Sequence, residues 1–478
     1  MMLERSRTKM VVTVGPASGT AAVFSRFCEL GISVARLNFS HGSLEQRADF
    51  LRMIRAQKTD FPPAIMGDLC GPKLRLGPVV NGGVRVVPGD EFIIQRQPLL
   101  GQAGVFSCNC PVLIDDVELG QKLLIDDGMI RALVIDKQAD AIRCKVTVGG
   151  IILGNKGLNL PNTRLHIASI TDKDWADIDW AIANQLDYLA LSFVRSSADV
   201  ESVRSYLNSR SANIALVAKI EMPQAVDDIV AIANAADAIL VARGDLGVEM
   251  DLTAVPLLQK QVVRAAHDAG KPVIVATQML QSMVEHPSPT RAEVSDVANA
   301  ILDGADAVML SGETATGQYP VAAVEVLRQI ADKTEDYVDK NNIEWPPPRL
   351  LQMMHHQTAA IAYGAKLIAR DMDARLAVVW SQAGGSARFL SKNRFTIPVV
   401  ALSTDAAAVR RMALYYGVAP LQTDIPEHFD DLPLMVDDLL VKRGWACCGD
   451  RVLIVAGAPL GTAGATNGLM VHTIGESG

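Results

Sequence analysis

The chain has 478 residues, too long for one ordinary domain, so we expect two to four domains. Hydrophobic residues make up 49% of it and aromatic residues only 5%, a composition typical of an α/β protein with a large aliphatic core. The net charge of −8 argues against a protein that binds nucleic acid or anionic membranes over its whole surface, so any anion site must be a local basic pocket.

Apolar, β-branched runs alternate with helical patterns over most of the first 340 residues. The runs are nearly continuous in apolar residues, as is usual for strands of a parallel sheet that is buried on both faces. The predicted strands are Met10–Gly15, Val34–Phe39, Ala64–Leu69, Tyr188–Val194, Ile214–Ile220, Ala238–Ala242, Val273–Thr277 and Ala307–Leu310. The predicted helices are Ala21–Leu30, Leu44–Gln57, Asp172–Asn184, Ala198–Ser209, Gln224–Ala235, Val255–Ala269, Arg291–Leu302 and Val321–Val338. Eight strand–helix units predict an α/β protein with a closed (β/α)8 TIM barrel, formed by residues 1–70 and 165–343.

Two further regions depart from this alternation. Between residues 71 and 164 the helical period disappears and turn signals such as Asn81-Gly82-Gly83 become frequent, which predicts an inserted all-β domain. After the stiff break Trp345-Pro-Pro-Pro348, an α/β pattern resumes and predicts a third domain over residues 349–478. Its predicted elements are a helix at Gln357–Arg370 and strands at Leu376–Trp380, Pro398–Leu402 and Val452–Ala456.

No segment has the pattern of a membrane span or an export signal. No apolar run reaches the roughly 18 residues that a membrane helix needs, and the apolar stretch behind the basic N-terminus stops at Gly15-Pro16. The seven cysteines lack the Cys-x-x-Cys spacing of zinc ligands. We therefore expect free thiols, a cytoplasmic location, and no nucleic-acid or membrane partner.

Polar residues follow the predicted strands at their C-terminal ends, where barrel enzymes carry their active sites. Lys219 and Glu221 stand two residues apart and therefore share one face of the fifth strand. Asp245 follows the sixth strand, so neighbouring strands could bring Glu221 and Asp245 together around a divalent cation such as Mg²⁺. Other strand ends contribute Arg36, Asn38, Ser40, Asp68, Ser192, Gly244, Thr277 and Ser311. A metal beside a lysine predicts a site for a phosphate or an enolate.

Taken singly, these residues also have ordinary explanations. Arg36 could be a surface arginine instead of a phosphate ligand. Lys219 could merely form a structural pair with Glu221, and Gly244 could serve only a turn. The joint arrangement of the polar residues at one rim of an apolar barrel favours an active site.

The sequence resembles the pyruvate kinase family over nearly its whole length. The matching segments are Thr13-Val-Gly-Pro16, Ala35-Arg-Leu-Asn-Phe-Ser-His-Gly42, Asn155-Lys-Gly-Leu-Asn-Leu-Pro161, Ala218-Lys-Ile-Glu221, Val241-Ala-Arg-Gly-Asp-Leu-Gly247, Ala276-Thr-Gln-Met-Leu280, Thr290-Arg-Ala-Glu293, Ala298-Asn-Ala-Ile-Leu-Asp-Gly304 and Val308-Met-Leu-Ser-Gly-Glu-Thr314. The resemblance implies a barrel domain, an inserted β-barrel lid and a C-terminal regulatory domain, assembled as a homotetramer. It also implies transfer of the phosphoryl group of phosphoenolpyruvate to ADP, giving pyruvate and ATP.

The resemblance further implies roles for the residues at the strand ends. Glu221 and Asp245 would hold Mg²⁺ or Mn²⁺, and Lys219 would stabilise charge on the phosphoryl group and on the enolate oxygen. Thr277 would bind the substrate carboxylate. Thr277 and Ser311 both remain candidates for passing a proton to the enolate through water.

Phosphate and nucleotide contacts are implied in the same way. Arg36 and Arg75 would clamp phosphate, and the backbone around Gly244 would meet the substrate carboxylate. Lys156, at the base of the lid, matches a position that binds nucleotide phosphate, and His41 would lie near it. The chain has no Walker-type loop, so this cleft must hold the nucleotide.

One segment departs from many relatives, which have Asp-Thr-Lys-Gly-Pro-Glu after the third strand. This chain has Asp68-Leu-Cys-Gly-Pro-Lys73 instead. In those relatives the region holds K⁺. Asn38, Ser40 and the aspartate are retained, but the leucine has no hydroxyl and Lys73 brings an ammonium of its own. We therefore predict catalysis without added K⁺.

The C-terminal domain contains a possible effector site. Ser381-Gln-Ala-Gly-Gly-Ser386 follows a predicted strand, which places Ser381, Gly384, Gly385 and Ser386 where backbone N–H groups can cradle a phosphate. The segment Pro459-Leu-Gly-Thr-Ala-Gly464 could form the facing loop. The resemblance implies a phosphorylated effector, such as a sugar phosphate or a nucleotide monophosphate. The alternative is a tight glycine turn without a ligand.

Two other functions are compatible with parts of this pattern. A Mg²⁺-dependent lyase or aldolase on the same barrel would also stabilise a pyruvate enolate, but it would not explain the inserted domain or Lys156. A metabolite sensor with a relic site would have lost at least one core residue, whereas Arg36, Lys219, Glu221, Asp245 and Thr277 are all present.

Overall fold

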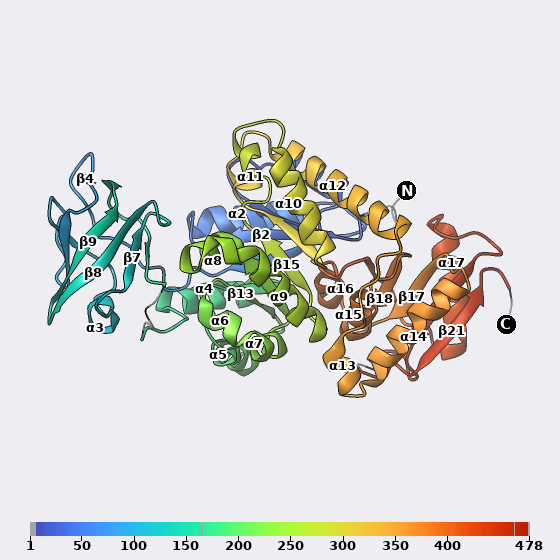
Figure 1. Ribbon diagram of the computed structural model, residues 1–478. Helices are drawn as coiled ribbons and strands as arrows, with labels where there is room; N and C mark the ends of the chain where they lie inside the picture. Colours follow the sequence, from blue (N-terminus) through green and yellow to red (C-terminus); the bar gives the residue numbers. More distant parts are fainter. Residues whose placement is uncertain (1–5, 162, 164–165, 463, 477–478) are drawn as a thin grey trace.

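The computed structural model describes residues 6–161, 163, 166–462 and 464–476, and three parts lie side by side in it (Figure 1). The central part is a closed barrel of eight parallel strands in the order β1-β16-β15-β14-β13-β12-β3-β2. Their bounds are β1 Lys9–Val14, β2 Val34–Asn38, β3 Ala64–Asp68, β12 Tyr188–Leu191, β13 Ala215–Ile220, β14 Ala238–Ala242, β15 Val273–Ala276 and β16 Ala307–Leu310. The predicted TIM barrel is thereby confirmed, and nearly every strand residue is buried, as its apolar sequence requires.

Helices surround the barrel. They are α1 Ala21–Leu30, α2 Leu44–Arg55, α4 Asp172–Ala183, α5 Ser197–Ser209, α6 Pro223–Asp227, α7 Ile229–Ala235, α9 Val255–Asp268, α10 Arg291–Leu302 and α12 Pro320–Lys340. Local signals fix their ends. For example, the Thr20 hydroxyl accepts a hydrogen bond from the Val23 N–H at the start of α1, and Gly31 ends that helix with a φ of 87°.

The structure differs from the predicted helices in two respects. The single helix predicted at Gln224–Ala235 is wrong, because Asp228 interrupts it and separates α6 from α7. The Asp228 carboxylate instead accepts a hydrogen bond from the Ser197 N–H. Short helices that were not predicted follow β14 and β16, namely α8 Arg243–Glu249 and α11 Gly312–Ala315. Gly244 therefore lies in the first turn of a helix.

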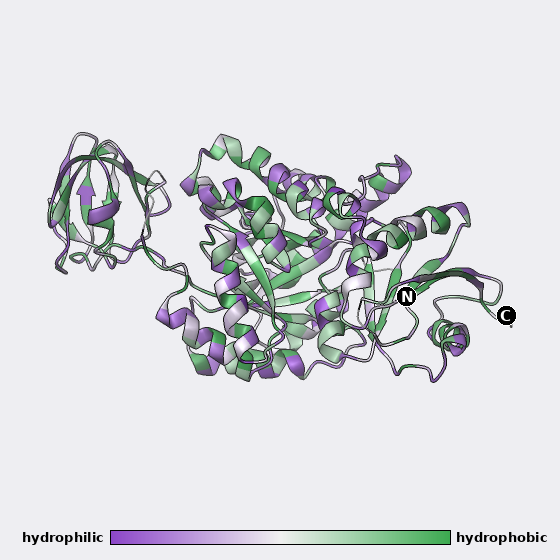
Figure 2. Cartoon of the chain, turned by 90° about the horizontal axis from the view of Figure 1, so that it is seen from below, coloured by the Kyte–Doolittle hydropathy of each residue, from purple (hydrophilic) through white to green (hydrophobic). Residues whose placement is uncertain are grey.

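The inserted part projects from the barrel on two connecting segments, with a hydrophobic core of its own (Figure 2). Its elements are β4 Val84–Val86, β5 Glu91–Gln95, β6 Val105–Ser107, α3 Leu113–Asp116, β7 Lys122–Ile125, β8 Ile130–Gln138, β9 Ala141–Val148, β10 Gly150–Ile152 and β11 Leu158–Asn159. The strands form a six-stranded sheet, β11-β7-β8-β9-β5-β6, and a two-stranded sheet, β10-β4. We call this part the lid, with the predicted bounds 71–164, of which residues 71–161 and 163 are described.

The C-terminal part is a five-stranded sheet in the order β19-β18-β17-β20-β21. Its elements are α13 Arg349–Met353, α14 Gln357–Asp371, β17 Leu376–Trp380, α15 Gly385–Lys392, β18 Val399–Ser403, α16 Ala406–Met412, β19 Val418–Gln422, α17 Leu432–Lys442, β20 Arg451–Ala456 and β21 Gly468–Thr473. Only the antiparallel β21 breaks the parallel order. None of the helices in the described part of the chain combines the length and apolar character of a membrane span.

A buried charge cluster joins the C-terminal part to the base of the barrel. The Lys392 ammonium, at the end of α15, lies 2.7 Å from the carboxylate of Asp306, which stands immediately before β16. Neither side chain is exposed to solvent. Arg394 approaches the second carboxylate oxygen at 3.3 Å. Because solvent does not reach the cluster, loss of one partner leaves an uncompensated buried charge.

We predict that Asp306→Asn lowers the free energy of unfolding by about 3–5 kcal/mol, since it leaves two buried cations without their anion. Thermal and denaturant unfolding of the whole chain measure the effect. Glu344→Gln is the matched control. Its ion pair with Arg370 is largely exposed and should contribute less than about 1 kcal/mol. Equal stability of the two variants would contradict the prediction.

Candidate active site

Lys219 lies at the centre of a charged network at the C-terminal ends of the barrel strands. Its ammonium lies 2.8 Å from Glu221 and 3.3 Å from Asp68, and it donates a hydrogen bond of 2.6 Å to the Ser192 hydroxyl. Only 12% of the Lys219 side chain is exposed. The alternation along β13 therefore places Lys219 and Glu221 on one face, as predicted.

Arg36 belongs to the same network and is not a surface arginine. Its Nε donates to Asp68 at 2.6 Å, and its Nη1 donates to the Thr13 hydroxyl at 2.8 Å. The register of the barrel explains this grouping, because Arg36 stands opposite Thr13 on one side and near Asp68 on the other. Thr13 had no assigned role in the sequence, since a strand threonine gives no signal of its partner.

The charged groups in this network shift one another's pKa values. Burial alone would lower the pKa of Lys219, but Asp68 and Glu221 outweigh burial and raise it. Burial would likewise raise the pKa of Asp68, but Lys219 and Arg36 hold it below the usual range. Lys219 is therefore a permanent cation and Asp68 a permanent anion.

Glu221 is buried and carries a pKa raised chiefly by burial. Lys219 opposes this rise, and repulsion from Asp245 adds to it, so the two carboxylates act on each other. One Glu221 oxygen also accepts a hydrogen bond of 2.7 Å from the Phe193 N–H. Within the described residues no group of three or more His, Cys, Asp or Glu side chains could hold a metal. A carboxylate pair suits a cation that keeps its other positions for substrate and water.

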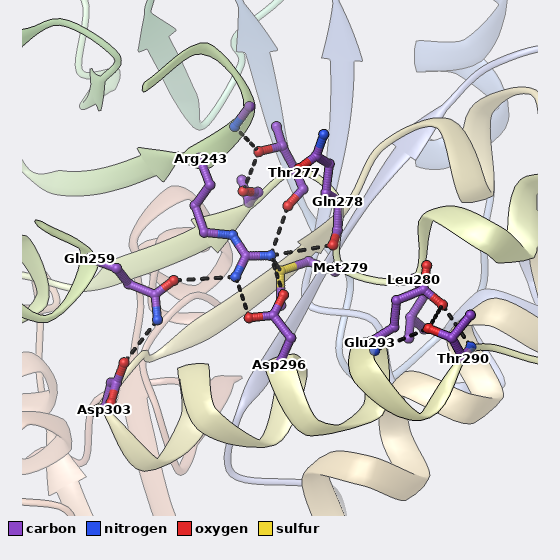
Figure 3. Close-up of polar contacts among 12 residues, drawn as sticks. Arg243, Gln259, Thr277, Gln278, Met279, Leu280, Thr290, Glu293, Asp296 and Asp303 are labelled. Carbon is purple, nitrogen blue, oxygen red and sulfur yellow. Dashed lines mark hydrogen bonds and ion pairs between the residues drawn. The ribbon is translucent and has the colours of Figure 1, made fainter. Parts of the chain in front are cut away.

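Thr277 and its neighbour occupy strained backbone that Arg243 supports (Figure 3). Thr277 and Gln278 have φ angles of 70° and 54°, which non-glycine residues rarely adopt. The Thr277 hydroxyl accepts a hydrogen bond of 2.7 Å from the Gly244 N–H. Arg243 donates to the Thr277 carbonyl at 2.9 Å and pairs with Asp296 on α10. The arginine thereby fixes the loop after β15 against α8.

Ser311 lies in a second braced loop, directly after β16. Its backbone N–H donates to one oxygen of Glu313 at 2.8 Å. The other oxygen of Glu313 accepts a hydrogen bond of 3.1 Å from the Leu280 N–H. Glu313 is buried and so ties together the loops that carry Thr277 and Ser311.

Two of the three predicted nucleotide residues, Arg75 and Lys156, lie at the root of the lid, and the third, His41, lies on the barrel. Lys156 pairs with Asp126 at 3.0 Å, and Arg75 donates to the Asn155 carbonyl at 3.0 Å. His41 is exposed on the loop after β2. The structure thus places Arg75 and Lys156 on the lid, while the substrate candidates lie on the barrel.

The residues of the predicted K⁺ region are partly separated. Asn38 accepts a hydrogen bond of 3.0 Å from the Ser40 N–H, and Asp68 belongs to the Lys219 network. Lys73 lies elsewhere, in the wall of a cavity of about 460 Å³ between lid and barrel. No hydrogen bond or ion pair among the described residues joins Lys73 to Asn38, Ser40 or Asp68.

Sequence reasoning missed Glu249, which ends α8 one turn after Asp245. Its carboxylate is buried and accepts a hydrogen bond of 2.6 Å from the Asn159 side chain. Burial raises the pKa of Glu249 to about 7. The Asn159 hydrogen bond opposes the rise, and the negative charges of Asp245 and Glu221 add to it. The sequence signal for Glu249 is its spacing of four residues from Asp245, which places both on one face of a helix. That signal could be used only if helix α8 had been predicted.

In the C-terminal part, three of the predicted effector residues, Ser381, Gly385 and Ser386, line a cavity of about 230 Å³, and Gly384 does not. Gly384 has a φ of 89° and precedes α15, whose first N–H groups border the cavity. The Ser381 hydroxyl accepts a hydrogen bond from the Ala387 N–H, and the Ser386 hydroxyl is bonded to Thr466. From the facing loop, Gly461, Thr462 and Gly464 line the cavity, and Ala463 lies outside the described residues.

Comparisons with known proteins identify the family of the chain. The family model of the pyruvate kinase barrel domain matches residues 5–324, and that of the pyruvate kinase alpha/beta domain matches residues 359–472. The pyruvate kinase of Geobacillus stearothermophilus is 41% identical over 477 residues, which cover 99% of this chain and 81% of that protein. The pyruvate kinase of Mycobacterium intracellulare is 39% identical over 472 residues, covering 98% and 99%.

A solved structure also matches the chain. The crystal structure of a pyruvate kinase from Cryptosporidium parvum matches with a TM-score of 0.90 at 32% identity, covering 98% of this chain and 96% of that one. These matches favour neither a lyase nor a sensor protein. Together with the strand-end site they show that the chain belongs to the pyruvate kinase family and is a phosphotransferase.

Proposed function

We propose that the enzyme transfers the phosphoryl group of phosphoenolpyruvate to ADP at the Lys219 network. The observation that carries the proposal is the position of the Lys219 ammonium, held between Asp68 and Glu221 at the strand ends. Phosphoryl transfer needs in-line positioning and charge neutralisation more than covalent help. A fixed cation beside a carboxylate pair can position the phosphoryl group and neutralise its charge.

Glu221 and Asp245 would hold Mg²⁺, or Mn²⁺ in its place. The fit rests on their mutual repulsion, which contributes to the raised pKa of Glu221 and which a bound cation would relieve. When bound, a divalent cation neutralises charge on phosphate and enolate oxygens. The family generally uses a divalent metal, and the choice of these two ligands is our proposal.

The remaining residues position the substrate. Asp68 and Thr13 engage two nitrogens of the Arg36 guanidinium and leave the third to bind a phosphate oxygen. Thr277 and the Gly244 backbone would meet the substrate carboxylate. The Thr277 and Ser311 hydroxyls stay the two candidates for delivering a proton to the enolate through water.

The lid would bring the nucleotide to this site. Arg75 and Lys156 would bind ADP phosphates, and His41 would approach them from the barrel. We further propose the division of the chain into a barrel of residues 1–70 and 165–343, the lid, and a C-terminal domain from residue 349. Residues 164 and 165, at the second boundary, lie outside the described residues. A homotetramer is proposed from the family alone.

We predict that Lys219→Met lowers kcat by about 10²–10³-fold, the usual effect of removing one charge-stabilising group. Glu221→Gln should raise the Mg²⁺ concentration required for half-maximal activity. A coupled assay of pyruvate and ATP formation measures both. Lys442→Met is the matched control, because its ammonium is exposed on α17, far along the chain from the site. Wild-type activity of Lys219→Met would refute the proposed site.

We also propose that Lys73 replaces K⁺. Leu69 supplies no hydroxyl, and Asp68 already has two cationic partners in Arg36 and Lys219. The Lys73 ammonium lies in a cavity wall at the root of the lid, and the cavity also borders Asp245.

The expected result is full activity in tetramethylammonium buffer, with little stimulation by K⁺. Lys73→Glu should create or increase dependence on K⁺, because it removes the built-in cation. Lys122→Glu makes the same change of charge at an exposed position of β7 in the lid and should not create a dependence on K⁺. A large stimulation of the wild-type enzyme by K⁺ would contradict the proposal.

We propose that a phosphorylated metabolite binds the C-terminal cavity and activates the enzyme. Two polar atoms that line it, His356 Nδ1 and Trp380 Nε1, are buried without a hydrogen-bond partner among the described residues. Buried polar atoms of this kind normally have a partner. A phosphate at the start of α15 would also meet free backbone N–H groups.

A panel of sugar phosphates and nucleotide monophosphates should therefore include a compound that lowers the KM for phosphoenolpyruvate. Ser386→Glu, which places a negative charge in the cavity, should abolish that response and leave basal activity intact. Saturation curves that no compound changes would count against an effector site.

A further inference from the structure

A cavity of about 350 Å³ lies where the C-terminal part meets the base of the barrel. The linker after α12, residues 341–348, contributes Trp345 to its wall, and the C-terminal part contributes Lys366 and Arg394. Arg394 approaches Asp306, which stands directly before β16. The cavity therefore lies at the opposite end of the barrel from Lys219, which stands near the C-terminal end of its strand.

The Lys366 ammonium is a half-buried cation without a counter-ion. It stands on α14, and no hydrogen bond or ion pair to another described residue engages it. Burial lowers the pKa of Lys366; Glu344 opposes the fall, and Arg370 and Arg394 add to it. Glu344 is itself paired with Arg370 at 3.4 Å. The charge of Lys366 is therefore compensated fully neither by solvent nor by the protein.

Arg394 adds a second positive charge to the wall. Its side chain is only 2% exposed, and it approaches Asp306 at 3.3 Å, but the same carboxylate already pairs with Lys392 at 2.7 Å. One anion thus serves two buried cations. The Arg394 guanidinium also lies 3.9 Å from the centre of the Tyr416 ring and 5.4 Å from that of the Trp345 ring. Both rings belong to the cavity wall, so the arginine and the aromatic groups hold one another in place.

The other charged groups of the lining form ion pairs. Arg7 lies 2.8 Å from Asp339, and Arg370 pairs with Glu344. Each of these arginines also contacts a second carboxylate outside the lining. The lining itself holds four cations and two anions, so it has an excess of positive charge. That excess is concentrated at the unpaired ammonium on α14.

Aromatic and aliphatic side chains form much of the remaining wall. Trp345, Phe395 and Tyr416 contribute rings, and Ile343 and Ile397 contribute aliphatic groups. Phe395 and Tyr416 are buried, which fixes their rings. The cavity volume falls at the lower end of the range of small-molecule sites, about 300–1,000 Å³. An unpaired cation among apolar walls suits a small organic acid.

We propose that this cavity binds a small organic anion, whose carboxylate or phosphate head pairs with Lys366 and whose apolar body packs against Trp345 and Tyr416. The occupant contacts the linker after α12 and helix α14 at the same time. Binding therefore stabilises the attachment of the C-terminal part to the barrel. The inference concerns the base of the barrel and does not rest on the proposed catalytic function.

The test is calorimetric binding of three probes to the full chain. Phenylacetate and phenyl phosphate carry a charged head and an aromatic body, and benzyl alcohol carries the body without the charge. No described residue lines both this cavity and the C-terminal cavity beside Ser386, so the measurement uses Ser386→Glu to keep anions out of the latter. At least one of the two anions should bind, which identifies the preferred head, and benzyl alcohol should not.

Variants at Lys366 show whether its charge holds the anion. Lys366→Met should weaken binding about tenfold, the effect of losing one hydrogen bond between charged groups. Lys366→Arg keeps the charge and should retain most of the affinity. Lys442→Met is the matched control, because its ammonium is exposed on α17. Without a probe, Lys366→Met should not lower the unfolding temperature, because it removes a half-buried charge that has no partner.

Hydrogen exchange locates the bound probe. At saturation, peptides spanning residues 342–346 and 364–370 should exchange more slowly, whereas a peptide spanning residues 381–386 should not change. The inference is overturned if neither anion binds, if Lys366→Met leaves the affinity unchanged, or if protection appears only in other segments. Benzyl alcohol binding as tightly as the anions would also overturn it, since the cavity would then not respond to charge.

Discussion

The buried ammonium of Lys219 is the interaction on which the arrangement of the site depends. Removing an ammonium ion from water costs several kcal/mol, so it must be compensated by nearby anions and acceptors. Asp68, Glu221 and the Ser192 hydroxyl supply them, from β3, the end of β13 and the residue after β12. Only a barrel that closes in the observed order brings these strand ends together. The fold and the charge network therefore require each other.

The network also leaves an imbalance that suits its chemistry. Asp68 is shared by Arg36 and Lys219, whereas Glu221 is paired with Lys219 and repelled by the charge of Asp245. Positive charge is therefore concentrated on the Asp68 side of the network. Such asymmetry is stable only in a rigid surrounding, which the arginine-braced loop after β15 provides.

The sequence was most informative where burial alone decides the structure. All eight barrel strands could be predicted, because strands buried on both faces read as continuous apolar runs. The prediction that Lys219 and Glu221 share one face followed from the alternation of side chains along a strand. The Arg36–Asp68 pair could not be predicted, since it depends on the register between β2 and β3. Helix α8 was missed because Arg-Gly-Asp-Leu-Gly has the composition of a turn, and with it Glu249 was missed.

Elements of the C-terminal sheet were missed for a related reason. Both β19 and β21 are edge strands of this sheet. β19 contains Pro420, which is tolerated at a sheet edge but argues against a strand in the sequence. β21 has Met470 and Val471 exposed, so its pattern does not alternate. Edge strands therefore lack the periodicity on which such predictions depend.

The two attachments of the barrel differ in the kind of interaction that holds them. The C-terminal part is fixed by a dry charge cluster at Asp306, whose separation would expose uncompensated ions to a low-dielectric interface. The lid is fixed by single hydrogen bonds at its base, to Asp174 and Glu249. Each such bond contributes only about 1–3 kcal/mol, an amount that substrate binding can redistribute. The junction with the C-terminal part therefore rests on a buried charge cluster, and the junction with the lid on individual hydrogen bonds to buried carboxylates.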